Sequence, residues 1–86
     1  MEIIIEIPDY DPNNGIRYEW ESGFEIDLKI KDQTVILTAN KEGLLSLANH
    51  LLNLAQDVIP AGHHLHFDEN NSLEQGSSEL IIEKKI

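Results

Sequence analysis

One segment alone in this chain carries a helical pattern, and strand-like segments lie on both sides of it. Within residues 41–57, apolar residues recur at spacings of three and four, which places them on one face of a helix. Asn40 precedes the segment as a good N-cap, and residues 59–62 (Ile-Pro-Ala-Gly) end it. We expect Leu51 and Leu52, at the middle of the stripe, to be buried. The stripe consists of Leu44, Leu47, Ala48, Leu51, Leu52, Leu54, Ala55 and Val58.

The rest of the chain alternates between apolar and polar residues, which predicts strands. The clearest case is residues 24–31, where Phe24, Ile26, Leu28 and Ile30 share one face and charged residues share the other. Ser22-Gly23 and Asp32-Gln33 fit two-residue turns. We therefore expect an α+β fold with a mainly antiparallel sheet of about six strands in the order ββββαββ and one amphipathic helix packed on one face. The expected strands cover residues 2–7, 16–21, 24–31, 34–39, 63–68 and 79–84.

Length and composition limit how such a fold can be stabilised. The chain has 86 residues and no cysteine, so we expect a single domain over residues 1–86 with neither a disulfide nor a zinc–thiolate site. Packing must stabilise the core alone or with the help of self-association, so a homodimer is left open. No basic start precedes an apolar leader, and polar residues interrupt the longest uncharged stretch, residues 43–56. These features predict a cytoplasmic protein.

The charge is strongly negative and unevenly distributed. Sixteen acidic residues face six Lys and Arg, and residues 1–27 hold eight of the acids against Arg17 alone. Like charges repel, which argues against binding to nucleic acid or to an anionic membrane. The excess predicts either a basic protein partner or a surface that serves solubility alone.

A histidine-rich strand is the one grouping that suggests metal chemistry. His64, His66 and Asp68 would share a face of residues 63–68, and such side chains can ligate a metal ion. Alternation with Leu65 and Phe67 explains the same spacing as an ordinary amphipathic strand. There is no cysteine and no Gly-x-Ser-x-Gly motif, so we expect no catalytic residue, no cofactor and no enzyme.

Four carboxylates are the candidate partner-binding residues. Glu19 and Glu21 lie on the polar side of one expected strand, and Glu25 and Asp27 on that of the next. A two-residue turn joins the strands, so we expect the four to be neighbours. Tyr10, in a loop rich in Pro, Asp and Asn, could anchor an interface, since tyrosine is frequent at interface hot spots, or could plug the end of the sheet.

The segment from about residue 40 to 85 resembles a known family. A leucine-rich amphipathic helix is followed by residues 62–69 (Gly-His-His-Leu-His-Phe-Asp-Glu), an acidic polar loop, and residues 76–84 (Gly-Ser-Ser-Glu-Leu-Ile-Ile-Glu-Lys). This order resembles small bacterial immunity proteins of polymorphic toxin systems. The resemblance implies a cytoplasmic, non-catalytic protein that binds and neutralises one cognate toxin. A metal-binding protein or enzyme using the histidine strand, and a structural adaptor subunit, are the alternatives.

Overall fold

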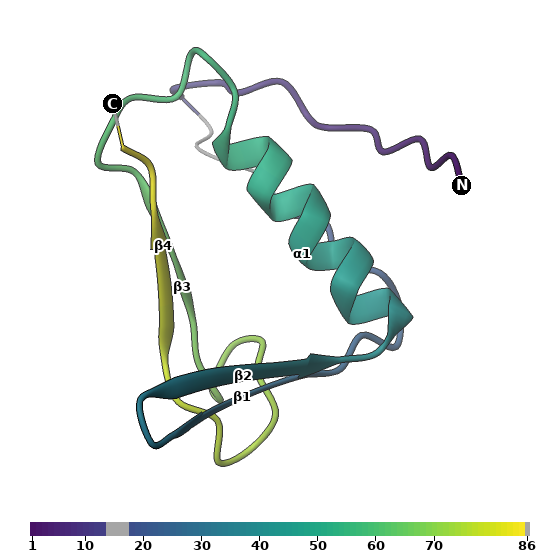
Figure 1. Ribbon diagram of the computed structural model, residues 1–86. Helices are drawn as coiled ribbons and strands as arrows, with labels where there is room; N and C mark the ends of the chain where they lie inside the picture. The colour runs from purple at the N-terminus through teal and green to yellow at the C-terminus, as the bar shows by residue number, and fades with distance from the viewer. Residues whose placement is uncertain (14–17, 86) are drawn as a thin grey trace.

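The computed structural model describes residues 1–13 and 18–85 and shows an α+β fold. The elements are β1 (Ile26–Lys31), β2 (Thr34–Ala39), α1 (Lys41–Leu54), β3 (His64–Phe67) and β4 (Leu80–Glu83). The four strands form two separate two-stranded antiparallel sheets, so the expectation of one sheet of about six strands is wrong. In Figure 1, the β1–β2 hairpin, the β3–β4 ribbon and α1 form three sides of a triangle. The buried core consists of Ile26, Leu28, Leu47, Leu54, Ile59, Leu65, Phe67 and Leu73.

The β1–β2 hairpin forms where the alternating pattern predicted it. Asp32 and Gln33 have positive φ angles of 50° and 70°, which is the backbone of a type I′ turn. Ile26 and Leu28 are buried as predicted, whereas Ile30, near the tip of the hairpin, is exposed. The outer edge of β1 is covered by a loop, because the amides of Glu74 and Ser78 donate to the carbonyls of Ile26 and Leu28 at 2.8 and 2.9 Å.

The β3–β4 ribbon confirms the predicted alternation of the histidine segment. Leu65 and Phe67 are buried, whereas His64 and His66 are exposed on the opposite face. The amide of Lys84 donates to the carbonyl of His63 at 2.8 Å and extends the pairing by one step beyond the strands. The apolar side of this ribbon therefore completes the core.

The helix begins as predicted but ends earlier, and its buried face is rotated so that, of the predicted stripe, only Leu47 and Leu54 are fully buried. Asn40 caps it by accepting a 2.8 Å hydrogen bond from the amide of Gly43, and the helix ends at Leu54 rather than near Asp57. Leu51 and Leu52 are 47% and 49% exposed, so the prediction that they are buried is wrong. The residues that are buried are Gly43, Ser46, Leu47, His50, Asn53 and Leu54.

A close backbone contact explains this rotation of the helix. A Cβ atom at Gly43 would lie 2.6 Å from the carbonyl oxygen of Glu25, so only glycine allows the first turn to approach β1 this closely. One turn later, the hydroxyl of Ser46 accepts a 2.8 Å hydrogen bond from the amide of Glu21. These two contacts turn the side of the helix that carries Gly43 and Ser46 inward and leave several leucines outside.

The N-terminal segment forms no strand, contrary to expectation for residues 2–7. Figure 1 shows that its first part runs on the helix side of the molecule, and further along Tyr10 reaches His63, just before β3. The side-chain amide of Asn49 donates to the carbonyl of Glu6, and that of Gln56 donates to the carbonyl of Pro8. Of the strand expected at 16–21, residues 16 and 17 lie outside the described residues, and residues 18–21 form no strand.

Candidate partner-binding surface

Residues 18–21 lie between two hollows, although they pair with no strand. Tyr18 and Trp20 line one hollow, whereas Glu19 and Glu21 line another together with Glu6. The predicted alternation of this segment therefore holds, even though its expected strand pairing does not. Glu19 and Glu21 are both exposed.

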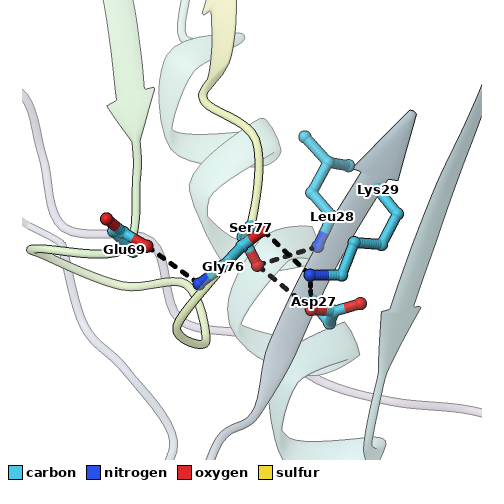
Figure 2. Close-up of polar contacts among 6 residues, drawn as sticks. All are labelled: Asp27, Leu28, Lys29, Glu69, Gly76 and Ser77. Atoms are coloured by element: carbon cyan, nitrogen blue, oxygen red, sulfur yellow. Dashed lines mark hydrogen bonds and ion pairs between the residues drawn. The ribbon is translucent and has the colours of Figure 1, made fainter.

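Glu25 and Asp27 border a third hollow at the edge of β1, next to Glu74. Glu25 is exposed, but Asp27 is half-buried and partly engaged within the protein. The Asp27 carboxylate accepts a 3.2 Å hydrogen bond from the hydroxyl of Ser77 and lies 3.5 Å from the ammonium of Lys29 (Figure 2). Asp27 thus also helps to hold the loop that covers β1.

The hairpin expected to join the two pairs of carboxylates is absent. The amide of Phe24 donates to the carbonyl of Glu21 at 3.2 Å, which closes a turn at Ser22-Gly23, but the residues before the turn form no strand. The two pairs therefore flank a turn and line separate hollows. Their role in binding stays a prediction.

Tyr10 packs against the core and is partly buried. Its ring meets the ring of His63 edge-on at 5.9 Å, and its amide donates to the side-chain oxygen of Gln56 at 3.2 Å. These contacts give Tyr10 a packing role, and its predicted role as an interface anchor is untested.

An aromatic cluster surrounds a buried histidine between α1 and residues 18–24. Trp20 stacks on Phe24 with ring centroids 4.4 Å apart and meets His50 edge-on at 4.3 Å. His50 is fully buried, and neither ring nitrogen has a hydrogen-bond partner among the described residues. Burial lowers the pKa of His50, because the charged imidazolium loses its hydration. Burial likewise raises the pKa of Tyr18, whose ring lies 5.2 Å from that of His50.

A pocket of about 290 Å³ opens beside this cluster. Its walls combine aromatic rings with the imidazoles of His64 and His66. Tyr18 and Trp20, which alternate with Glu19 and Glu21 along the chain, contribute to this pocket. The lining residues are Tyr18, Trp20, His64, Leu65, His66, Phe67, Asn71 and Ser72.

The structure gives no support to the metal-binding alternative. Within residues 1–13 and 18–85, no group of three His, Cys, Asp or Glu side chains is placed to hold a metal ion. The rings of His64 and His66 are near each other, with centroids 4.7 Å apart. Asp68 instead accepts a hydrogen bond from the amide of Asn70 within its own turn.

Comparison with known protein families places the chain among the immunity proteins. A model of a family of immunity proteins matches residues 34–85, more than half of the chain. The chain belongs to this family, Immunity protein 32. No curated protein and no solved structure matches it.

Family membership confirms the resemblance and implies a cognate toxin as the partner and neutralisation of that toxin as the function. Immunity proteins are typically non-enzymatic inhibitors, which agrees with the expectation that this chain is not an enzyme. In the part of the chain that the structure describes, no helix is long and apolar enough to cross a membrane.

Proposed function

We propose that this protein neutralises its toxin by binding a basic surface of the toxin with the carboxylates of Glu19, Glu21, Glu25 and Asp27. One observation carries the proposal. Glu19, Glu21 and Glu25 are exposed, and among the described residues none of them has a cation within ion-pair distance. Carboxylates left without a counter-charge can be neutralised by a basic partner, and opposite charges also speed the encounter of two proteins.

Two of the protein's own cations are already engaged elsewhere. The ammonium of Lys29 lies beside Asp27 and donates to the carbonyl of Gly76 at 2.8 Å (Figure 2). The ammonium of Lys84 donates to the carbonyls of Gln56 and Ile59 after the end of α1. Lys29 therefore partly neutralises Asp27, whereas among the described residues no cation lies within ion-pair distance of Glu19, Glu21 or Glu25.

The division of the chain between family and non-family segments supports the same proposal. The family match covers β2, α1, β3 and β4, whereas all four carboxylates and Tyr10 lie before residue 34. We infer that the matched segment is the common framework and that residues 1–33 adapt it to one toxin. In this account, Tyr10 contributes its partly exposed ring to the interface, and binding takes place in the bacterial cytoplasm.

The test is a triple charge reversal, Glu19→Lys, Glu21→Lys and Glu25→Lys. We expect association with the toxin encoded beside this protein to slow by roughly tenfold or more at low salt, since steering by charge contributes about 10–10³ to association rates. The dependence of the rate on salt should weaken, and the thermal melt should stay unchanged because these side chains are exposed. Asp27→Asn is measured separately, because the Asp27 carboxylate also holds Ser77.

The matched control reverses three exposed acids elsewhere, with Asp57→Lys, Glu79→Lys and Glu83→Lys. It changes the net charge by the same amount as the test variant, so any effect of total charge is common to both. If both folded variants associate equally fast, the proposed surface is wrong and the acidity serves solubility.

A further inference from the structure

The two outer edges of the β1–β2 hairpin differ, because another segment of the chain pairs with β1 but none among the described residues pairs with β2. The outer edge of β1 is sealed by residues 74–78, whose backbone bonds to the carbonyls of Ile26 and Leu28. The hydroxyl of Ser77 also accepts from the amide of Leu28 at 3.1 Å (Figure 2). This shows that, on β1, the even-numbered residues direct their backbone groups outward.

The register of the hairpin then fixes which groups of β2 point outward. Leu28 pairs with Leu37, and Ile30 pairs with Val35. In an antiparallel pair, opposed residues alternate between exchanging both hydrogen bonds and exchanging none. Val35 and Leu37 therefore direct their amides and carbonyls away from β1. Within the described residues, no backbone or side-chain group bonds to this edge.

The side chains of β2 are also exposed to solvent. Val35, Ile36 and Leu37 are 59%, 45% and 37% exposed, and Ile30 beside Val35 on β1 is exposed as well. The strand Thr34–Ala39 holds neither a charged residue nor a proline. Proteins usually protect an edge strand with charges, proline or a bulge, because a bare apolar edge pairs with another strand. β2 has none of these protections, so we expect another strand to cover it.

We propose that β2 pairs antiparallel with β2 of a second copy of this chain, about a two-fold axis at Ile36. Val35 then lies opposite Leu37 of the second copy, and each such pair exchanges two backbone hydrogen bonds. Ile36 lies opposite Ile36 of the second copy on the other face. The two hairpins become one four-stranded sheet, which is more stable than a two-stranded one.

Charge favours a second copy over the basic toxin as the occupant of this edge. Along residues 34–38 of β2 the neighbouring charges balance, because Asp27 and the turn residue Asp32 offset Lys29 and Lys31, and the further acids Glu25 and Glu74 lie toward the Ala39 end. A basic partner gains no attraction there, whereas a chain with a net charge of −10 can approach its own copy only through a neutral region.

This inference does not rest on the toxin, and it uses the outward backbone edge of β2 rather than the carboxylates, of which Asp27 pairs with Thr38 from the β1 side. The test is the mass of the full-length chain in solution without toxin, by light scattering across a wide range of concentration. We expect a dimer that dissociates on dilution. A monomer at every concentration would overturn the proposal, whether or not the acidic surface binds the toxin.

Two substitutions test the edge itself. Ile36→Glu places a carboxylate across from Lys29 in the monomer, which tolerates it, but brings two like charges together at the two-fold axis. Val35→Pro removes an outward amide and leaves the β1 ladder intact. We expect both variants to stay folded, to melt as the parent does when it is diluted to monomer, and to be monomers at concentrations where the parent is a dimer. Leu51→Glu, at a similarly exposed apolar position on α1, should leave the dimer intact.

Cross-linking tests the register, because the chain has no cysteine of its own. Opposed residues of a pair without hydrogen bonds have Cα atoms about 4.5 Å apart, within the range that a disulfide spans. Ile36→Cys should therefore give a disulfide-linked dimer on mild oxidation, and Val58→Cys, also exposed, should not. Equal cross-linking from both positions, or a dimer that persists in Ile36→Glu and Val35→Pro, would contradict the proposed pairing.

Discussion

His50 is a polar residue at a position where the packing suits an apolar one. Its ring contacts Tyr18, Trp20 and Phe67, and neither nitrogen has a hydrogen-bond partner among the described residues. A buried polar group without a partner costs about 1–3 kcal/mol, so the histidine is tolerated rather than favoured here. It is tolerated as the neutral imidazole, because burial lowers its pKa.

This predicts the effect of pH on His50→Phe. Because the pKa of His50 is lower in the folded state, the unfolded chain takes up the proton first, and the parent loses stability as the pH falls below about 6.5. Phenylalanine removes this loss and the unpaired nitrogens. Thermal melts between about pH 7 and pH 5 should show the variant at least as stable as the parent at neutral pH and less sensitive to acid. The exposed His66→Gln is the control, and an equal acid sensitivity in parent and His50→Phe would refute the assignment.

At the scale of the helix, sequence periodicity predicted the element but not its buried face. The spacing of the leucines predicted the helix, and Asn40 predicted where it begins, because periodicity and capping are local properties of the sequence. The orientation depends instead on Gly43 against the backbone of Glu25 and on Ser46 bonded to Glu21. Glu21 and Glu25 lie about 20 residues before the helix, so the helical sequence alone does not reveal these contacts. The buried face also carries polar residues, which a search for apolar periodicity ignores.

A pair of alanine substitutions measures this orientation directly. Leu54→Ala removes a buried side chain and should cost about 2–5 kcal/mol of unfolding free energy. Leu51→Ala changes the same residue type on the exposed face and should cost about 1 kcal/mol or less. Denaturant unfolding of both variants checks the difference, and equal losses would mean that the helix faces the core with its leucine stripe after all.

For the strands too, the sequence predicted what depends on local pattern and missed what depends on distant contacts. β1, β2, β3 and β4 lie within predicted segments, because alternation and turn residues are local properties. The apolar run at residues 2–7 has strong strand propensity, but a strand also needs an edge to pair with. Residues 74–78 already occupy the outer edge of β1, which no local pattern revealed. The N-terminal segment bonds to the side chains of Asn49 and Gln56 instead, and not to the open edge of β2.

At the scale of the molecule, two small sheets and one helix share a single core. A two-stranded sheet is marginal alone, so Ile26 and Leu28 of one hairpin need Leu65 and Phe67 of the other. This frame leaves three surfaces without cover in the described structure: the carboxylates around residues 19–27, the aromatic pocket, and the edge of β2. The acidic composition predicted exposed carboxylates. The aromatic pocket depends on side-chain packing and the open edge of β2 depends on strand pairing, and neither can be read from the sequence.

As a member of an immunity protein family, this chain is expected to neutralise its toxin by binding it in a stoichiometric complex. Titrating the purified protein into a fixed amount of its cognate toxin, and following the residual toxin activity, tests this expectation. Toxin activity should fall in proportion to the added protein and be lost at an equimolar ratio, with the two chains eluting as one complex. Loss of activity at a small fraction of that ratio, or inhibition without a complex, would contradict it.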